Sequence, residues 1–316
     1  MKVLFLCPDY FGIYKVIQKE ILNQTSCELK SIIFEDYKYK NSFQKIQNFL
    51  AKTFLKKNLK KIWASKERIS TITEDDYFDF LFVICPDFLL NDELKYVTER
   101  AKKRIVYFWD SFDNIPRYER TLPFFDVKYS FEPKDVEKYQ LKQLTNFYFN
   151  TERNPSPKND VFFIGTLDER IHLIKKILNS VEKLGKTSKI FLQTKNENAP
   201  KIHPSNSIEF IRNAIPFEES EKIYDDSKII LDVQKTIQKG LTFRVFDAMG
   251  KGKKLITTNE DIINYDFYNA NNIFIWKNDT EYIPESFFDS PYEELSTEIF
   301  EKYSLKNWVK TIFEIK

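Results

Sequence analysis

The segment Asp232–Thr258 carries the residues of this chain that are best suited to chemistry. An apolar run predicts a buried strand at Ile229–Val233, and the polar loop Gln234–Gly240 follows it and opens a helix. Backbone N–H groups at a helix start bind anions, and three side-chain donors stand beside this one. These donors are Lys239, Thr242 and Arg244. The pattern indicates a diphosphate-binding site.

Asp247 follows Arg244 by three residues, so both side chains are expected on one side of the predicted helix. An ionised carboxylate there is a strong acceptor and would hold sugar or ribose hydroxyls. The pattern has a second interpretation, a capped helix with an Arg244–Asp247 surface pair and a glycine at its end. The spacing leaves both interpretations open.

A strand, a Gly-Thr turn and a helix start are predicted within Phe162–Arg170. Gly165 would let the backbone approach a nucleotide, and Thr166 or Arg170 would contact phosphate. The alternative is an ordinary strand-to-helix turn that uses a glycine, with Asp168 or Glu169 in the first turn of the helix.

Aspartates follow two predicted strands in the first half of the chain. Asp9 follows the first strand, and Asp110 and Asp113 follow the fourth. Carboxylates at strand ends face a ligand cleft, so Asp110 and Asp9 are the candidate bases for deprotonating an acceptor hydroxyl. Gly12 suits the close approach of a ligand near the same cleft as Asp113. The alternative for each aspartate is an N-cap or turn role, the commonest use of Asp at such positions.

Short apolar runs alternate with longer amphipathic stretches, which is the pattern of a parallel α/β sheet. Strands are predicted at Val3–Leu6, Ser31–Phe34, Phe80–Ile84, Ile105–Phe108, Val127–Ser130, Val161–Ile164, Lys189–Leu192, Ile208–Phe210, Ile229–Val233, Lys254–Thr257 and Ile273–Ile275. Helices are predicted at Tyr14–Leu22, Phe43–Ala64, Asp92–Ala101, Lys134–Tyr139, Ile171–Leu184, Phe217–Asp225, Thr242–Met249, Asp261–Tyr265 and Thr297–Ile315.

A length of 316 residues suits two domains. The stretch Thr151–Asp160 contains two prolines and no apolar residue, which is typical of a linker. We therefore predict an N-terminal Rossmann-like domain at 1–150, a linker at 151–160, a C-terminal Rossmann-like domain at 161–296 and a C-terminal helix at 297–316. Two doubly wound domains would face a central cleft, because ligands bind at the carboxyl ends of parallel strands.

Composition excludes several classes of protein. Lys+Arg 49 against Asp+Glu 47 leaves a net charge of +2, which argues against nucleic acid as a partner. A charged fraction of 30% argues against an integral membrane protein, and the apolar run Met1–Cys7 is too short for a signal or spanning segment. Three cysteines and two histidines match no disulfide framework and no zinc spacing, so a cytoplasmic location is expected.

The sequence GLTFRVFDAMGKGKKLITTNEDIINYDFYNANNI resembles the donor-binding motif of GT-B glycosyltransferases, in which a Gly-Leu loop precedes a helix reading Arg-x-x-Glu-Ala. More narrowly, it is similar to the CgeB-like glycosyltransferases of bacterial capsule and lipopolysaccharide biosynthesis. Four further segments fit that group in order, namely Tyr107–Phe112, Phe124–Tyr139, Asp160–Arg170 and Glu301–Trp308. The group has Glu where this chain has Asp247.

The resemblance implies an α/β GT-B fold and a glycosyltransferase that moves a sugar from a nucleotide-sugar donor to an acceptor hydroxyl in bacterial surface polysaccharide. It implies that the C-terminal domain holds the donor, that the N-terminal domain holds a glycan or lipid-linked glycan acceptor, and that the C-terminal helix packs back on the N-terminal domain. The donor-binding residues are then expected to be Gly165, Thr166, Arg170, Gln238, Lys239, Gly240, Leu241, Thr242, Arg244 and Asp247.

The resemblance also implies metal independence, and no Asp-x-Asp pair for Mg²⁺ or Mn²⁺ occurs in the chain. No cofactor is expected beyond the nucleotide sugar itself. Two other functions stay open. One is a nucleotide-sugar epimerase or hydrolase on the same fold, and the other is a non-catalytic nucleotide-sugar-binding module, which the change to Asp247 keeps in view.

The stretch Phe43–Arg68 is both basic and amphipathic. Eight positive charges stand in it against one negative charge, Glu67, and apolar residues recur every three to five positions. Such a stretch would lie on an anionic membrane, at the inner face of the plasma membrane, and bring an enzyme to a lipid-linked acceptor. The alternative is a core-facing helix with a solvated lysine face.

Overall fold

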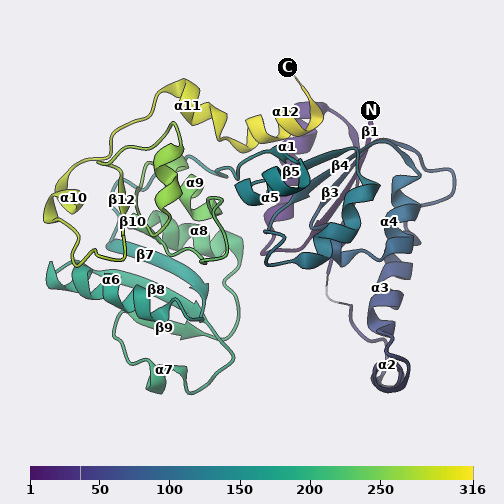
Figure 1. Ribbon diagram of the computed structural model, residues 1–316, viewed down its shortest axis with the longest axis horizontal. Coiled ribbons are helices and arrows are strands. Elements are labelled where there is room, and N and C mark those ends of the chain that lie inside the picture. Colours follow the sequence, from purple (N-terminus) through teal and green to yellow (C-terminus); the bar gives the residue numbers. More distant parts are fainter. Residues whose placement is uncertain (36, 316) are drawn as a thin grey trace. The chain divides into compact units, whose positions relative to one another are not determined.

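The computed structural model describes residues 1–35 and 37–315, and the chain divides into two compact units. The first unit comprises Met1–Leu144 with Ile315, and the second comprises Thr145–Glu314. Each unit is a parallel sheet with helices on its faces (Figure 1). Lys316, the last residue of the predicted C-terminal helix, lies outside the described residues.

The first unit holds a six-stranded parallel sheet in the order β2-β1-β3-β4-β5-β6. Its strands are β1 Lys2–Pro8, β2 Glu28–Phe34, β3 Phe78–Ile84, β4 Ala101–Phe108, β5 Val127–Ser130 and β6 Lys142–Gln143. Its helices are α1 Ile13–Thr25, α2 Ser42–Leu55, α3 Leu59–Ile69, η1 Pro86–Phe88, α4 Asn91–Thr98, η2 Pro116–Phe124 and α5 Pro133–Tyr139. The inner strands β1, β3 and β4 end in continuous buried runs, as parallel strands covered on both faces should.

The second unit holds another six-stranded parallel sheet, in the order β12-β11-β10-β7-β8-β9. Its strands are β7 Asn159–Thr166, β8 Ser188–Gln193, β9 Ile208–Ile211, β10 Ser227–Asp232, β11 Lys254–Thr257 and β12 Ile273–Ile275. Its helices are α6 Ile171–Lys183, α7 Ala199–Ile202, α8 Phe217–Asp225, α9 Phe243–Gly250, η3 Glu260–Asn264, α10 Glu285–Asp289, α11 Thr297–Lys302 and α12 Leu305–Phe313. α6 packs on one face of this sheet, and α8, α9 and α11 pack on the other (Figure 1).

Two predicted long helices are each broken in two. The helix predicted at Phe43–Ala64 ends at Leu55, where Lys56 is left-handed with φ 51°, and Asn58 caps α3 by accepting from the N–H of Lys61. The helix predicted at the C-terminus breaks before Ser304, which caps α12. Polar caps satisfy the free N–H groups of a new helix start, so a local side chain overrides the helical period.

Two smaller helix predictions need correction. The helix predicted at Asp92–Ala101 ends at Thr98, because Ala101 is already the first residue of β4. The helix predicted at Asp261–Tyr265 is the short 3-10 helix η3.

The chain joins the second unit earlier than the predicted linker at 151–160. Asn146 donates to the carbonyl of Leu241 at 2.9 Å, and the backbone of Tyr148 bonds to that of Tyr303 at 3.1 Å. The predicted linker also ends inside β7, which begins at Asn159. Within the second unit the ring of Trp308 on α12 lies 4.7 Å from that of Phe147. The packing of the C-terminal helix on the first unit stays a prediction.

None of the helices in the described residues is both long enough and apolar enough to cross a membrane.

The carboxylate of Asp135 makes the first unit sensitive to pH. It lies in the first turn of α5 and accepts from the N–H of Phe112 at 3.0 Å, and burial raises its pKa from the ordinary 3.8 to about 6. A raised pKa means that the folded state holds the proton more tightly, so this group costs stability as the pH rises from about 4 to about 6. We expect Asp135→Asn to gain stability relative to the parent over that interval.

Urea denaturation at both ends of the interval measures this difference, with exposed Asp75→Asn as the matched control. A difference between Asp135→Asn and the parent that does not change with pH would contradict the assignment.

Candidate functional site

The strand order of the second unit predicts where a ligand binds. Numbered along the chain, its six strands follow the Rossmann order 3-2-1-4-5-6, with β7 as the first and β10 as the fourth. α6, which follows β7, and α9, which follows β10, pack on opposite faces of the sheet, so a ligand crevice is expected at the carboxyl ends of these two strands. β7 and β10 are neighbours in the sheet, paired Ile229 with Val161 and Ile230 with Phe162.

Arg244, in the first turn of α9, bridges the ends of these two strands. Its Nε and Nη2 donate to the carbonyl of Ile164 on β7 at 3.3 and 3.0 Å, and its Nη1 lies 3.1 Å from Oδ1 of Asp232 on β10. The guanidinium also stacks over the ring of Phe163, 4.9 Å from its centroid. The side chain remains 22% exposed, so this positive charge is accessible to solvent at the carboxyl ends of the two strands.

Asp232 was not among the predicted donor-binding residues. It is fully buried, and besides Arg244 it accepts from the hydroxyl of Thr242 at 2.8 Å and from that of Thr257 at 3.1 Å. Thr242 is the N-cap residue of α9, but its hydroxyl is used on Asp232 and makes no cap bond. Asp232 therefore ties the start of α9 to β10 and β11. In the sequence, Asp232 could have been noticed only as an acidic residue at the end of a buried apolar strand.

The loop that precedes α9 is held through its carbonyls. Gln234 donates to the carbonyls of Gln238 and Gly240 at 2.8 and 2.9 Å, and Asn259 donates to that of Lys239 at 2.9 Å. Asn146 holds the carbonyl of Leu241 in the same way, and the Leu241 side chain is buried in the core under α9. The structure therefore brings six of the predicted donor residues to one edge of the sheet. They are Gln238, Lys239, Gly240, Leu241, Thr242 and Arg244.

The end of β7 completes this edge. A Cβ on Gly165 would lie 2.9 Å from Cζ of Phe163 and 3.7 Å from Nη2 of Arg244, so the glycine leaves room for both side chains. Thr166 is the last residue of β7 and is exposed. Arg170 is held by Asp168 and by the carbonyl of Val233 at 2.7 Å, so it anchors the start of α6 to the end of β10. Contacts of Thr166 or Arg170 with phosphate stay predictions.

Asp247 and Arg244 have different partners. Asp247 is buried, and its carboxylate accepts from the N–H of Phe149 at 3.4 Å. Burial raises the pKa of Asp247 well above its usual range, with the charge of Glu221 adding to the effect. The interpretation of an Arg244–Asp247 surface pair is therefore wrong, because the side chain of Asp247 points into the protein and bonds to Phe149. The contact of Asp247 with a sugar hydroxyl stays a prediction.

In the first unit the predicted aspartates make turn contacts. Asp9 follows β1 and accepts from the N–H of Gly12 at 3.0 Å, where Gly12 has a φ of 84°. Asp110 follows β4 and accepts from the N–H of Ser111 at 2.8 Å and from Nδ2 of Asn114 at 2.6 Å. Asp113 is exposed in the same loop. These contacts agree with the turn interpretation, and the base role stays a prediction.

A third carboxylate, Asp87, was not among the candidate bases predicted from the sequence. It follows β3, the strand that borders β1 at the point where the strand order of this sheet reverses. One of its oxygens accepts from Nη2 of Arg117 at 3.1 Å, and among the described residues the other is buried without a hydrogen-bond partner. Burial raises the pKa of Asp87 above its usual value. Its sequence signal is a Pro-Asp pair directly after a buried apolar run.

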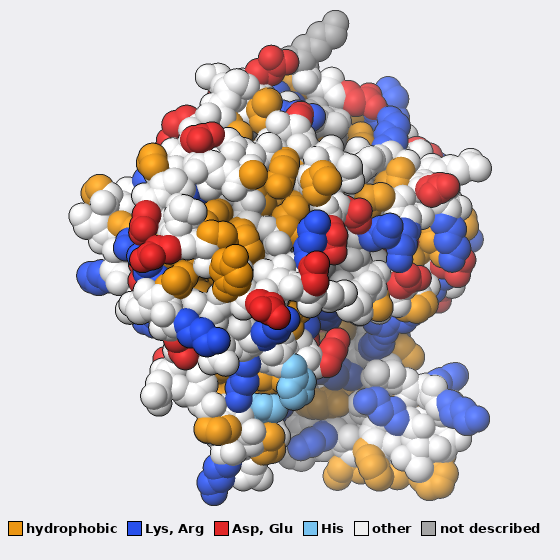
Figure 2. All heavy atoms as spheres, turned by 60° about the vertical axis from the view of Figure 1, so that its left-hand side comes forward, with side chains coloured by type: hydrophobic (Ala, Val, Ile, Leu, Met, Phe, Trp, Pro, Cys, Tyr) orange, Lys and Arg blue, Asp and Glu red, His pale blue; other side chains and the backbone are white. Residues whose placement is uncertain are grey.

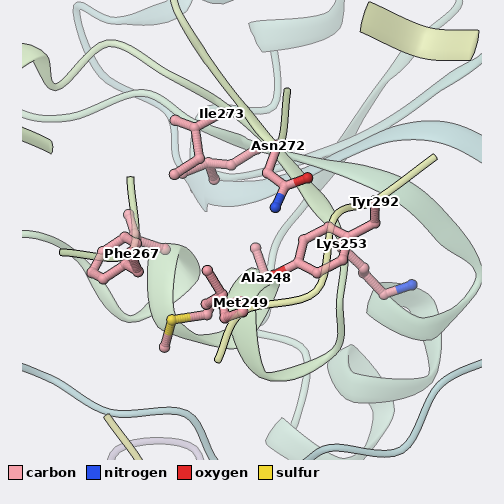
Figure 3. A pocket seen from close by; sticks show the side chains of 10 residues that line it. Ala248, Met249, Lys253, Phe267, Asn272, Ile273 and Tyr292 are labelled. Atoms are coloured by element: carbon pink, nitrogen blue, oxygen red, sulfur yellow. The ribbon is translucent and has the colours of Figure 1, made fainter. Parts of the chain in front are cut away.

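A small cavity lies at a different place in the second unit (Figure 3). Ala248 and Met249 of α9 face Phe267, Asn272 and Tyr292 across it. Its volume is about 10 Å³, which is roughly the room that one water needs. It is therefore too small for a nucleotide sugar.

Comparison with known proteins identifies the fold. No known family and no curated protein matches the chain. Among solved structures it is similar to the UDP-GlcNAc 2-epimerase of Methanocaldococcus jannaschii, at 10% identity over 100% of this chain and 99% of that chain, with a TM-score of 0.56. The UDP-GlcNAc 2-epimerase of Neisseria meningitidis is 12% identical over 100% of this chain and 99% of that chain, with a TM-score of 0.54. A glycosyltransferase from Rickettsia africae ESF-5 is 11% identical over 99% of this chain and 97% of that chain, with a TM-score of 0.50. The chain has the α/β GT-B fold of two Rossmann-like units, which confirms the predicted fold class.

Removal of the Asp232 carboxylate tests its structural role. We expect Asp232→Ala to lower the free energy of unfolding by about 3 kcal/mol, because it leaves the partly buried Arg244 and two hydroxyls without their acceptor. The control variant is Asp289→Ala. The carboxylate of Asp289 is 60% exposed and pairs with Lys186, so its loss should lower the free energy of unfolding by only about 0–1 kcal/mol. Urea denaturation measures both, and equal losses would refute the role of Asp232.

Proposed function

We propose that the protein is a glycosyltransferase that moves a sugar from a nucleotide-diphosphate donor to an acceptor hydroxyl during synthesis of a bacterial surface polysaccharide, such as capsule, lipopolysaccharide or exopolysaccharide. The observation that carries this proposal is the guanidinium of Arg244, fixed by Ile164 and Asp232 at the crevice between β7 and β10. Two solved structures of the same fold support a nucleotide-sugar ligand. The M. jannaschii enzyme is in complex with UDP-GlcNAc and UDP, and the N. meningitidis enzyme is bound to UDP-GlcNAc.

In this proposal the second unit binds the donor. A guanidinium has five N–H donors, and Ile164 and Asp232 use three of those on Arg244, so two remain for a diphosphate. Lys239 and the backbone N–H groups at the start of α9 would share the same phosphates, whereas the hydroxyl of Thr242 donates its proton to Asp232. These donors are in place before the reaction, so they would stabilise the negative charge that develops on the leaving diphosphate without a metal ion.

The first unit would bind the acceptor and provide the base. Asp110 or Asp9 takes the proton of the acceptor hydroxyl as its oxygen bonds to the anomeric carbon of the sugar. The bond between that carbon and the diphosphate oxygen breaks, and the nucleoside diphosphate leaves with the electron pair. The acceptor is a glycan or a lipid-linked glycan, and we place the enzyme in the cytoplasm at the inner face of the plasma membrane.

The second candidate function is that of a nucleotide-sugar epimerase. The observation in its favour is that two of the similar solved structures are UDP-GlcNAc 2-epimerases, with TM-scores above that of the Rickettsia glycosyltransferase. A hydrolase or a non-catalytic binding module would use the same donor site. The fate of the sugar separates these functions.

Nucleotide binding followed by product analysis tests the proposal. We expect one of UDP, GDP, CDP, ADP, dTDP or CMP to raise the melting temperature selectively in the presence of EDTA. The matching labelled nucleotide sugar should then yield labelled glycan only when a membrane or glycan acceptor is added. Inverted configuration of the free nucleotide sugar would indicate the epimerase, released free sugar the hydrolase, and binding without turnover the binding module. No stabilisation by any nucleotide would overturn a donor site.

Arg244→Ala tests the residue that carries the proposal. We expect it to weaken nucleotide binding by about 1.5–3 kcal/mol, the value of a charge-assisted hydrogen bond, which is roughly tenfold or more in Kd. Arg212→Ala is the matched control, because Arg212 is an exposed arginine of the same unit and pairs with Glu197. Calorimetric titration on variants with a normal unfolding transition makes the measurement. Equal affinity of the two variants would remove Arg244 from the donor site.

A further inference from the structure

Helix α2 turns its polar side to the protein and its apolar side to water. Its two buried residues are Asn48 and Ala51. Six large apolar side chains of the helix are between 46% and 76% exposed, namely Phe43, Ile46, Phe49, Leu50, Phe54 and Leu55. A surface helix of a globular protein normally does the reverse. An exposed apolar patch of this kind marks an interaction surface.

The contacts that hold α2 in this orientation are hydrogen bonds. The amide oxygen of Gln44 accepts from the N–H of Lys40 at 2.9 Å and from the hydroxyl of Tyr37 at 3.3 Å. Asn48 donates to the hydroxyl of Tyr39 at 2.8 Å and accepts from the N–H of Lys60 at 3.1 Å. These directional bonds fix which side of the helix faces inward. The apolar side is therefore presented outward by the fold itself.

The charge around this apolar surface has a single sign. Residues 37–66 contain nine lysines and no aspartate or glutamate. Lys45 and Lys52 lie one turn to either side of Phe49 on the helix, and Lys56 and Lys57 stand at its C-terminal end. Hydrophobic side chains and lysines gather at the lower right of Figure 2, over this part of the first unit. The partner must therefore be both apolar and negatively charged.

We propose that α2 docks on an anionic lipid bilayer, with its aromatic and aliphatic side chains among the acyl chains and the surrounding lysines at the phosphate headgroups. A bilayer with anionic lipids meets both requirements at once, since an interfacial helix gains from buried apolar area and from headgroup charge together. A second copy of the chain would bring the same nine lysines face to face. The inference adds to the proposed function the surface by which the protein reaches the membrane, and its test is separate, because vesicle binding needs neither donor nor acceptor.

Sedimentation of the full chain with vesicles tests this inference. We expect binding to vesicles made of equal parts phosphatidylcholine and phosphatidylglycerol, weaker binding at high salt, and none to phosphatidylcholine alone. The double variant Phe49→Ser, Phe54→Ser should lose affinity by at least about tenfold, because two Phe side chains no longer leave water. Replacement of Lys45, Lys52, Lys56 and Lys57 by Gln should remove the preference for phosphatidylglycerol.

The matched control changes an exposed apolar residue and a neighbouring lysine on another helix. Ile202 on α7 is 58% exposed and follows Lys201, so Lys201→Gln, Ile202→Ser should bind vesicles as the parent does. All these positions are at the surface, and a normal unfolding transition confirms that each variant is folded. Equal binding to both kinds of vesicle, or to neither, would overturn the inference. Self-association that the Phe49→Ser, Phe54→Ser variant loses, without vesicle binding, would assign the surface to a second copy.

Discussion

The second unit depends on a carboxylate that is buried without being isolated. A charged group out of water costs several kcal/mol unless partners compensate for it, and Asp232 finds its partners on two different elements. Arg244 and Thr242 belong to the start of α9, and Thr257 belongs to β11. The bonds that compensate the charge therefore also set the position of the helix start above the strand ends. A guanidinium that is held in this way needs no reorganisation to meet an anion.

Different side chains follow the strands at the points where the two sheets reverse their order. The second sheet reverses between β7 and β10, and the guanidinium of Arg244 lies at that point. The first sheet follows the order 2-1-3-4-5-6 and reverses between β1 and β3, where two carboxylates, Asp9 and Asp87, follow the strands. Binding an anionic leaving group and accepting a proton are the two halves of a group transfer. In the proposed transfer the second unit would bind the leaving group and the first unit would hold the base.

The sequence predicts the sheets well and the site only in part, for physical reasons. Parallel strands covered on both faces are continuous apolar runs, so Lys254–Thr257 and Ile273–Ile275 were predicted with the bounds the structure shows. The helix breaks at Asn58 and Ser304 were missed, because one capping residue interrupts the helix without interrupting the apolar period. The loop before α9 was predicted, because a polar stretch stands between an apolar strand and a recognisable helix start. Asp232 has no period and no motif, and only the fold shows what surrounds it.

The same limit explains α2. Its apolar period was read correctly from the sequence, but a period states only that a helix has two different sides. Which side faces inward depends on what the rest of the unit offers, and here the neighbours are the hydroxyls of Tyr37 and Tyr39 and the backbone N–H of Lys60. In the structure these groups bond to the polar side chains of Gln44 and Asn48. The polar contacts therefore occur together with an outward-facing apolar side, an arrangement that the period alone does not predict.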